Sequence, residues 1–508
     1  MVTMVLPKLR LQMRLLSLAL LLFPFVVFSR PVRYEISPLF KEGTLRLQVR
    51  VWFAGDADGD TKLLMPNGLG KTKYLFRCVQ NLVCNTPGSQ LRMEPDSSFV
   101  SIRHASGQDL KLYYEIAQDF PGASVPEQHT NRPIIQPDYF HVLGSAFFVV
   151  PQWNEGYEVT LEWRNFPDNW LLHNSFGATP TSQQFSFQDL RWLESVFIGG
   201  DYRIRQADVS GNPVWLAIRG RDWDFSDDSL LGVIQRTVTL QRNFWQDFET
   251  PCYTVLLTPL AQRPAMSFGR LVSTRISYSG LGLHQSFSAF ATPHNGQDWK
   301  ELCGLFHHEL MHHWIGSKIR SGCQNMQMAW FTEGFTDYFA LKNMLEGGFL
   351  TPSQYIEHLN EQFFDALYHS PRREAPNSVI ADSFFLDPKV EKLPYLRGCV
   401  FAFFLDNAIK SGSNGQQNLH QLMLDLLGYY ERPDRDLLHN FDFFLETCSD
   451  YLKKDITPFY QKHIMDGRLI AADEFLLPAY LKMEVDEEGS PFFWLDKSVA
   501  DWEKGIKE

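Results

Sequence analysis

The hydrophobic pattern of the chain changes once, near Asp224, and this change limits the folds that the sequence can adopt. Before it, short segments alternate apolar and polar residues between turn-forming clusters, which is typical of half-buried β-strands. Clear examples are Leu45–Phe53, Lys111–Ile116 and Glu158–Trp163. After it, apolar residues recur mainly at helical spacing. The pattern therefore predicts an α+β protein, with an N-terminal antiparallel β domain and a mainly α-helical domain after it.

The 508 residues of the chain are enough for two or three domains. We expect a β domain over residues 30–224, a mainly helical domain over 225–475, and a C-terminal tail over 476–508 to which the pattern assigns no structure. Residues 201–221 are typical of a hairpin with a Ser-Gly-Asn-Pro turn, and we place this hairpin at the end of the β domain.

The second half carries clear signals for the ends of its elements. Ser226 and the two aspartates after it predict the start of a helix that runs to about Phe248. Thr351 and Pro352 predict another helix start, and the Gly347–Gly348 pair is expected to end the helix before it. The expected strands are 252–259 and 271–291, the second interrupted near Gly280, and the expected helices are 297–316, 329–346, 352–368, 394–411, 417–431 and 436–464.

The first 29 residues have the layout of a secretory signal peptide. Basic residues precede a short apolar run at 15–28, and Val27 and Ser29 supply the small side chains of a cleavage site after Ser29. The apolar run is short for a membrane span, although an uncleaved anchor is the alternative. We therefore expect a secreted or periplasmic protein with no stable membrane insertion after signal cleavage.

The charge of the chain argues against a nucleic-acid partner. Its 59 acidic residues outnumber its 47 Lys and Arg residues, and no basic block interrupts this acidity. An acidic balance of this kind favours solubility.

Seven cysteines fit an exported protein only loosely. The odd number leaves at least one thiol unpaired. Cys78 and Cys84 are close enough in the sequence to bridge a hairpin loop, and Cys303 and Cys323 flank the helix with the HExxH pattern described next. Buried thiols are the alternative for both pairs, because a large core does not need disulfides.

Residues 308–312, His-Glu-Leu-Met-His, form an HExxH pattern in an expected helix. Positions i and i+4 lie on one face of a helix, so His308 and His312 can both reach one tetrahedral Zn²⁺. Glu309 lies beside the first ligand, where its carboxylate can act as general base toward a zinc-activated water. The pattern also occurs by chance, and a helix with surface and core histidines is the alternative.

A second segment, Trp330–Tyr338, offers the carboxylate that such a site still needs. A catalytic zinc with two histidines requires one further protein ligand and an open position for water. Glu333 lies among apolar and aromatic residues, where metal binding would remove the cost of an unpaired charge. Asp337, one turn later, is placed to accept the other N–H of a ligating histidine. We predict one zinc ion per chain, held by His308, His312 and Glu333; a solvated helix face is the alternative for the two acids.

His307 and His313 lie next to the two expected ligands, but neither is spaced to complete a second HExxH pattern. We expect them to be packing or rim residues, where either can influence how a substrate pocket responds to pH.

Taken together, these residues resemble the M61 (glycyl aminopeptidase-like) metallopeptidases, gluzincins related to the M1 aminopeptidases. The resemblance covers about residues 190–480 and implies an N-terminal β domain followed by a thermolysin-like catalytic domain. The blocks that carry it are HHELMHHWIGSKIR at 307–320, AWFTEGFTDYFALKNML at 329–345, Tyr395-Leu396-Arg397-Gly398 followed by VFAFFLDNAIK at 400–410, and PFYQKHIMDG at 458–467.

The resemblance also implies a role for Tyr395, which matches the tyrosine of the family's Tyr-x-Lys-Gly motif. Its hydroxyl is similar in position to the group that hydrogen-bonds the tetrahedral oxyanion, where developing negative charge needs a donor. A half-buried core tyrosine is the alternative. Arg397 occupies the position of the family's lysine.

The segment Gly280-Leu281-Gly282-Leu283-His284 is similar to the family's Gly-Gly-Leu-Glu-His strand, which lines the substrate cleft. The resemblance implies that Gly280, Gly282 and His284 contact the substrate. Leu283 stands where the family has a glutamate, and in aminopeptidases of this class the equivalent acid helps to hold the free amine. Aminopeptidase and endopeptidase activity therefore both stay open, since the strand can still pair with an extended substrate backbone.

The sequence thus predicts an exported zinc metallopeptidase that acts on peptides or proteins. One alternative is a catalytically degenerate relative that binds peptides or a protein partner without cleaving them. Another is a zinc hydrolase of non-peptide substrates. We expect no C-terminal PDZ domain of the kind found in the family, because few residues follow the last matching block.

Overall fold

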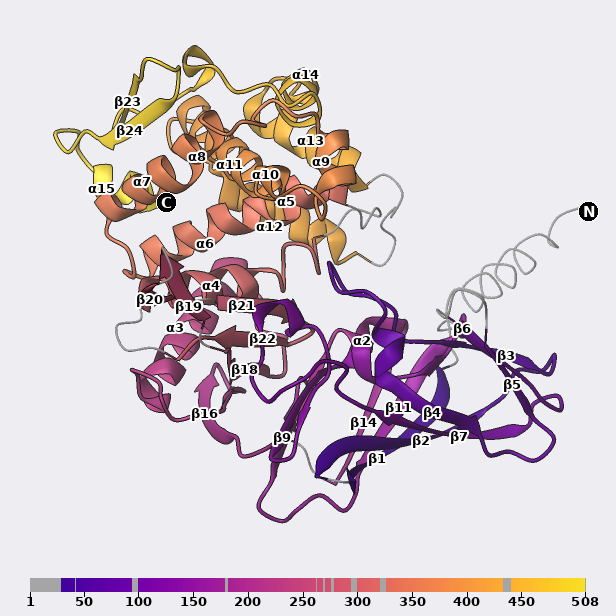
Figure 1. The fold of residues 1–508 in the computed structure, drawn as a ribbon. Helices are drawn as coiled ribbons and strands as arrows, with labels where there is room; N and C mark the ends of the chain where they lie inside the picture. The colour runs from indigo at the N-terminus through magenta and orange to yellow at the C-terminus, as the bar shows by residue number, and fades with distance from the viewer. Residues whose placement is uncertain are drawn as a thin grey trace, which may run out of the picture.

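The fold is that of a computed structural model, which describes residues 29–41, 43–93, 99–178, 181–261, 263–267, 270–275, 278–293, 299–319, 326–432 and 440–507. The expected signal peptide lies outside these ranges except for Ser29, so it stays a prediction. Within the described ranges, no helix combines the length and the apolar character that a membrane crossing needs. Figure 1 shows two parts, a β region that contains β1 and a helical region that contains α15.

The β region, residues 29–200, consists of three sheets, which run from indigo to purple in Figure 1. Positions along β2 alternate between buried and more exposed over the whole strand, as expected for a strand with one face in the core. The six-stranded sheet has the order β14-β11-β1-β2-β7-β4, formed by Ser182–Phe187, Gly156–Trp163, Ser29–Lys41, Thr44–Ala54, Asp109–Ile116 and Val79–Cys84.

Two smaller sheets complete the β region. One has the order β10-β3-β6-β5, formed by Val150–Pro151, Asp60–Leu64, Phe99–Arg103 and Gln90–Met93. The other has the order β13-β12-β15-β9-β8, formed by Gly177–Ala178, Leu171–Asn174, Val196–Gly200, Tyr139–Leu143 and Ile134–Gln136.

The expectation of a purely antiparallel β domain is wrong at one pair of strands. β1 runs parallel to β11, with Ser29 opposite Gly156, so the six-stranded sheet is mixed. An alternating pattern shows which face of a strand is buried, but it does not show the direction of the neighbouring strand. The two strands are also far apart in the sequence, so no turn signal links them.

A five-stranded sheet lies between the β region and the helical region, and we call it the central sheet. Its order is β16-β17-β18-β22-β21, formed by Arg203–Val209, Asn212–Ile218, Tyr253–Pro259, Ser286–Ala291 and Tyr278–Leu283. β17, β18 and β22 are parallel to one another, and β21 is antiparallel to β22 at one edge. The expected strand 271–291 is three strands, since β20 (Arg270–Arg275) pairs with β19 (Arg263–Ser267) in a separate ribbon. The interruption expected near Gly280 is wrong, because β21 runs through this residue and the turn to β22 lies at 284–285.

The hairpin β16–β17 has the expected turn but not the expected place. It pairs with β18, so it belongs to the central sheet and not to the β region. The boundary expected at residue 224 therefore falls after the first two strands of the central sheet. Local patterns predict a hairpin equally well in either position, and only long-range pairing decides between them.

Two helices cover the central sheet. α3 (Asp227–Trp245) is capped by Ser226, whose hydroxyl accepts a hydrogen bond from the Ser229 N–H, as the sequence predicts. α4 (Trp299–Met311) packs beside α3 over the same sheet. Their shared core includes Leu230 and Ile234 of α3 and Phe306 of α4.

The helical region is built around α11 (Leu393–Gly412), which is buried along most of its length. The expected helix 329–346 consists of α5 (Ala329–Thr332) and α6 (Gly334–Glu346), which meet at Glu333. The other helical elements are η4 (Met326–Met328), α7 (Pro352–Leu359), η5 (Asn360–Asp365), α8 (Ala366–Tyr368), α9 (Asn377–Ser383), α10 (Pro388–Glu391), α12 (Leu419–Tyr430), α13 (Asn440–Leu452), α14 (Thr457–Tyr460), η6 (Gln461–Met465) and η7 (Ala472–Glu474).

The helix start expected at Thr351 and the helix end expected at Gly347–Gly348 are confirmed. Thr351 caps α7 through a capping box with Gln354, and Pro352 is the first helical residue. Gly348 adopts a φ of 67° after α6, a conformation that glycine adopts without strain.

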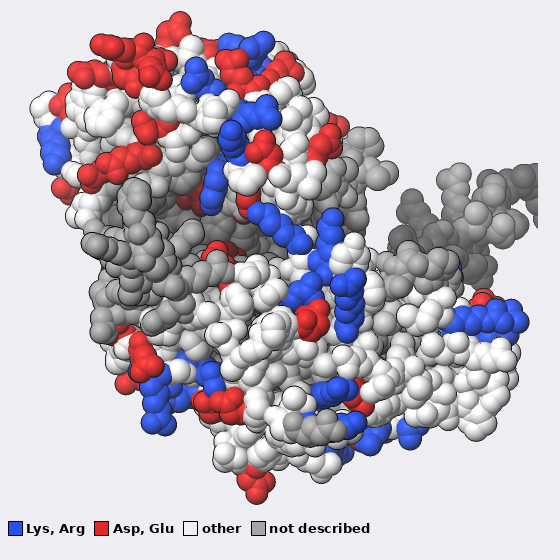
Figure 2. All heavy atoms as spheres, viewed as in Figure 1, with Lys and Arg blue, Asp and Glu red and all other residues white. Residues whose placement is uncertain are grey.

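The C-terminal tail forms a hairpin and a short helix that pack on the helical region. The hairpin consists of β23 (Leu481–Val485) and β24 (Pro491–Leu495), and the helix is α15 (Trp502–Lys507). The amide of Asn360 pairs with both backbone groups of Phe493, at 2.8 and 3.0 Å. Acidic side chains gather over this end of the molecule in Figure 2.

The cysteines do not form the first bridge considered above. Cys78 and Cys84 are both free thiols, and burial raises the pKa of Cys78 to about 12. Cys323, the second member of the other pair, lies outside the described residues.

Candidate metal centre and active-site cleft

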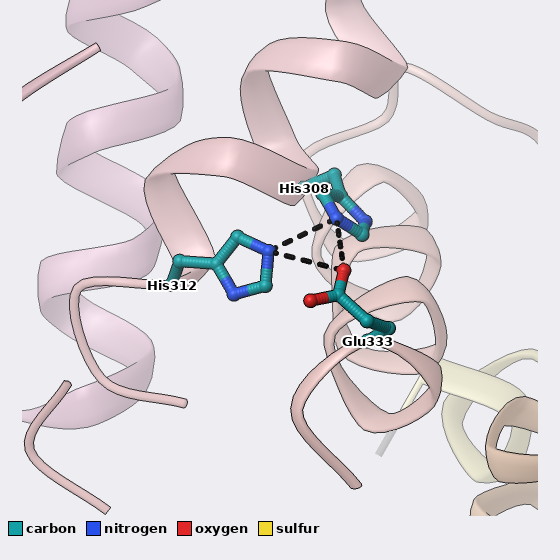
Figure 3. Close-up of side chains that lie close together, drawn as sticks. All are labelled: His308, His312 and Glu333. Atoms are coloured by element: carbon teal, nitrogen blue, oxygen red, sulfur yellow. Dashed lines mark hydrogen bonds and ion pairs between the residues drawn. The ribbon is translucent and has the colours of Figure 1, made fainter. Parts of the chain in front are cut away.

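His308, His312 and Glu333 converge on one point between α4 and the junction of α5 and α6. Figure 3 shows the two imidazoles projecting from successive turns toward the carboxylate. The two Nε2 atoms are 3.1 Å apart, and each is 3.5 Å from Glu333 Oε2. Within the described ranges, these residues are the one group of three His, Cys, Asp or Glu residues close enough to hold a metal ion.

The geometry of these three atoms fits a zinc ion. Zinc–ligand bonds of about 2.0–2.1 Å in a tetrahedron place neighbouring ligand atoms about 3.4 Å apart. The observed distances between the three ligand atoms, 3.1, 3.5 and 3.5 Å, lie just below and just above that value. The donor set is also appropriate, because two imidazoles and one carboxylate leave a fourth position open.

Hydrogen bonds hold both imidazoles in the orientation that a metal needs. Nδ1 of His308 donates to Asp337 Oδ1 at 2.7 Å, and Nδ1 of His312 donates to the Ile315 carbonyl at 3.2 Å. With Nδ1 protonated on each ring, Nε2 keeps its lone pair for the shared centre. Asp337 therefore occupies the position expected for it.

The charges around the site favour a cation. Burial acts to lower the pKa of His308, but Asp337 and Glu333 outweigh it and raise that pKa well above the ordinary value. In the same way, burial acts to raise the pKa of Glu333, but the two histidines hold it well below its usual range. With Glu309, three carboxylates surround two imidazoles, and this excess of negative charge suits a divalent cation.

Glu309 lies next to this cluster and contacts the edge strand of the central sheet. Its Oε2 accepts a hydrogen bond of 2.8 Å from the Gly282 N–H. A Cβ atom at Gly282 would lie 3.0 Å from the Glu309 carbonyl oxygen and 3.3 Å from Oε2. Glycine at this position therefore lets β21 pass close to α4.

The other residues expected on this strand have different surroundings. A Cβ at Gly280 would lie 2.2 Å from the Phe287 ring, so this glycine makes room for a core side chain. The His284 ring packs against Phe187 and Phe176 of the β region, with centroids 5.2 and 6.4 Å away. Burial lowers the pKa of His284 to about 4. The contacts described for His284 do not include the three candidate ligands.

Leu283 faces away from Glu309. Successive residues of a strand point to opposite faces, and Leu281 and Leu283 pack together against an apolar cluster that includes Leu256 and Phe290. The position where the family has a glutamate is therefore part of an apolar contact and carries no charge.

Tyr395 lies in the first turn of α11 beside the cluster, with its ring centroid 6.2 Å from that of His308. Burial raises the pKa of its hydroxyl, and the nearby carboxylates of Glu333, Asp337 and Glu309 raise it further. The hydroxyl therefore stays protonated and can donate a hydrogen bond.

Arg397, in contrast, is a structural residue. It is buried, and its guanidinium donates to the carbonyls of Arg373 and Ala375 at 3.0 and 2.8 Å.

His307 and His313 are packing residues, as expected from their spacing. His307 is fully buried, its Nδ1 lies 2.8 Å from the Cys303 carbonyl, and burial lowers its pKa to about 4. His313 bonds to the Thr250 hydroxyl at 3.0 Å through Nε2.

A cleft of about 890 Å³ opens beside this cluster. Its lining includes His308, Glu309, Asp337 and Tyr395, and the exposed side chain of Lys392 reaches the same space. The Nζ of Lys392 lies 5.0 Å from the centre of the Tyr395 ring. Lys392 and the apolar residues of the cleft were not predicted from the sequence. The helical spacing of Leu341 and Met344 after Asp337 is a signal that could have placed these two residues on the same face, and no such signal exists for Lys392.

Comparison with known proteins supports the resemblance. Residues 301–384, which contain all three candidate ligands, match the family described as M61 glycyl aminopeptidase. This match confirms the resemblance that the motifs indicate, to M61 peptidases related to the M1 aminopeptidases. No curated protein matches the chain.

Solved structures share the fold at low sequence identity. An aminopeptidase N family protein from Idiomarina loihiensis aligns with a TM-score of 0.71 and 15% identity, over 90% of this chain and 79% of that one. An M1 zinc metallopeptidase from Deinococcus radiodurans aligns with a TM-score of 0.55 and 14% identity, over 89% of this chain and 96% of that one. The order of a β region followed by a helical region is therefore a shared architecture.

Proposed function

We propose that this chain, an M61-type peptidase related to the M1 aminopeptidases, hydrolyses peptide bonds with one zinc ion held by His308, His312 and Glu333. The observation that supports it most directly is the triangle of two Nε2 atoms and one carboxylate oxygen, with edges of 3.1, 3.5 and 3.5 Å. Zinc bound there would supply Lewis-acid polarisation of the scissile carbonyl and a more acidic water molecule.

Glu309 is the general base in this proposal. Its carboxylate removes a proton from the attacking water and delivers a proton to the leaving amine. The hydrogen bond from Gly282 at 2.8 Å holds one oxygen of this carboxylate in place. The other oxygen has no such partner among the described residues, which leaves it available for the water.

Tyr395 stabilises the oxyanion in this proposal. As the carbonyl becomes tetrahedral, negative charge grows on its oxygen, and a protonated hydroxyl near the ligands can donate to it. Burial and three neighbouring carboxylates keep this hydroxyl protonated.

The strand β21 can bind the substrate backbone. It forms one edge of the central sheet and pairs with β22 on one side. An extended peptide can add to an exposed strand edge through main-chain hydrogen bonds. We further propose that β21, α4 and the α5–α6 junction form a thermolysin-like arrangement. The proposal also includes the domain limits expected from the sequence and the export of the protein.

Metal analysis tests the ligand set. We expect about one zinc per chain in the purified protein by plasma mass spectrometry, and a large loss of zinc in Glu333→Ala. Glu357→Gln, an exposed change on α7, is the control and keeps its zinc. No zinc after reconstitution at neutral pH would overturn the ligand assignment.

Cleavage is tested separately with a mixed peptide library. Zinc-loaded wild type cuts peptides, whereas Glu309→Gln keeps zinc and loses cleavage. Leu283, which carries no charge for a free amine, motivates the alternative of a degenerate peptide-binding protein. That alternative predicts intact peptides with zinc-loaded wild type.

A further inference from the structure

The cleft continues away from the candidate metal centre into an apolar cavity. The cleft and this cavity together have a volume of about 890 Å³, within the range of sites that bind ligands and far larger than a single water needs. Figure 2 shows the surface hollowed between the helical region and the rest of the molecule, with Lys and Arg side chains along the border.

Two helices carry both the candidate metal centre and the cavity wall. On α4, Leu305 lies one turn before His308 and faces the same space. On α6, Asp337 is followed at helical spacing by Leu341 and Met344. The polar reaction centre and the apolar cavity are therefore adjacent parts of the same helix faces.

The inner wall of the cavity is apolar and buried. Leu341, Met344, Leu350, Phe363 and Leu396 line it, and their side chains are between 3% and 9% exposed. They belong to the large core of the helical region, which holds them in place. A charged side chain placed among them would lose its hydration without gaining a partner.

The polar groups that line the cavity lie elsewhere. His358, Gln362 and Lys392 are exposed, so they form an outer rim. The two carboxylates in the described lining are Asp337, which bonds to His308, and Glu309, which bonds to Gly282. An apolar interior with a polar rim is the usual form of a pocket for a hydrophobic group.

We infer that this cavity is the specificity pocket of the enzyme and that it takes a large apolar side chain, such as Phe, Leu or Met, next to the scissile bond. The inference rests on the proposed function. A substrate with glycine in this position would leave the pocket empty. Losing the apolar contacts of a few methylene groups lowers kcat/KM by about 10-fold or more. A Glu or Lys side chain in this position is rejected.

The test compares peptides that differ at one residue beside the cleaved bond. For wild type, we expect kcat/KM for Phe or Leu to exceed that for Gly by at least about 10-fold. Ala366→Leu, which adds three carbons at a half-buried position of the cavity wall, shifts the preference toward Ala and Gly. Met344→Trp fills the cavity further and gives a larger shift. Met93→Trp, at a side chain 56% exposed on β5, leaves the preference unchanged.

The outcomes separate the two proposals. If wild type cleaves best beside Gly or charged residues, and both cavity variants keep this preference, the proposed pocket is disproved but the proposed peptidase activity is not. If zinc-loaded wild type cleaves no peptide, the proposed peptidase activity is disproved, and the pocket is then tested by peptide binding. The binding test uses zinc-loaded Glu309→Gln. The pocket is supported if this variant binds a Phe peptide more tightly than a Gly peptide and if adding Ala366→Leu weakens the binding of the Phe peptide. Equal binding of the two peptides overturns the pocket. Thermal unfolding and zinc content show whether Met344→Trp is folded.

Discussion

At the scale of single residues, the candidate centre depends on how its histidines are held. The imidazoles of His308 and His312 are oriented by different acceptors, a carboxylate and a backbone carbonyl. A carboxylate acceptor also makes the ring a stronger ligand, because it stabilises positive charge on the imidazole. Asp337 therefore affects metal binding although it is not one of the three proposed ligands.

Replacing Asp337 by Asn keeps the shape of the side chain and removes its charge. We expect zinc affinity to fall roughly 10- to 100-fold, as is typical when a partner of a ligating histidine is changed. Competition with a chelating dye measures the affinity. Asp382→Asn, an exposed change on α9, is the control. Equal affinity in Asp337→Asn and wild type would show that the carboxylate does not support His308.

Replacing Tyr395 by Phe removes the proposed oxyanion donor. We expect kcat to fall roughly 100- to 1,000-fold while zinc content stays the same, because the hydroxyl acts on the transition state. Steady-state kinetics on a cleaved library peptide measures the change. Tyr74→Phe, at a tyrosine 52% exposed in the β region, is the control. Unchanged kcat in Tyr395→Phe would assign the tyrosine to packing.

At the scale of elements, the site depends on a close crossing between α11 and the α5–α6 pair. A Cβ atom on Gly398 would lie 1.7 Å from the Trp330 carbonyl oxygen, and one on Gly334 would lie 2.4 Å from the Gly398 Cα. Two glycines therefore allow the backbones to approach. This approach brings Tyr395 on α11 close to Glu333.

Gly398→Ala is expected to force these helices apart. We predict a loss of about 1–3 kcal/mol or more in unfolding free energy, since the added methyl group overlaps backbone atoms. Gly428→Ala on α12 is a matched control, because a Cβ there has nothing within 4 Å. That control should be stabilised by about 0.5–1 kcal/mol through helix propensity. Chemical denaturation measures both, and equal effects would contradict the crossing argument.

At the scale of the whole molecule, a buried charge network joins the C-terminal helix to the helical region. Asp406 on α11 bonds to the Tyr338 hydroxyl at 2.6 Å and to Lys410 at 2.9 Å. Lys342 on α6 donates to the Ile506 carbonyl of α15 at 2.8 Å. Lys342 and Asp337 both lie on α6. The tail therefore contacts the same helix that supports the candidate metal centre.

Asp406→Asn is expected to destabilise the protein by about 3–5 kcal/mol at neutral pH, because it removes the charge that pairs with buried Lys410 and accepts from the Tyr338 hydroxyl. Burial acts to raise the pKa of Asp406, but Lys410 and Lys342 lower it to about 2. A depressed pKa stabilises the fold above the unfolded value of about 3.9, and this stabilisation is lost as pH falls toward 2.

The difference between wild type and Asp406→Asn should therefore shrink between pH 4 and about 2. Urea unfolding at several pH values measures it, with the exposed change Asp450→Asn on α13 as control. A difference that does not depend on pH would mean that Asp406 acts through shape alone.

The sequence alone predicted many of the elements, though not α9, α10 or the tail hairpin, and it predicted the ligand set. The 3.6-residue period places His308 above His312, and the strand and helix signals are local, so no distant contact is needed to read them. Glu333 was predicted from the cost of a charge among apolar neighbours. The structure places these three residues together as expected, with His307 and His313 in packing positions.

Long-range packing decided the rest. The sheet that contains the hairpin β16–β17, the direction of β1 beside β11, and the packing of the tail all depend on partners distant in the sequence. The same holds for the surroundings of His284 and Leu283, and for the apolar cavity, whose walls come from different helices. Local propensity determines which segments are strands or helices, whereas burial of their apolar faces against one another determines where they meet.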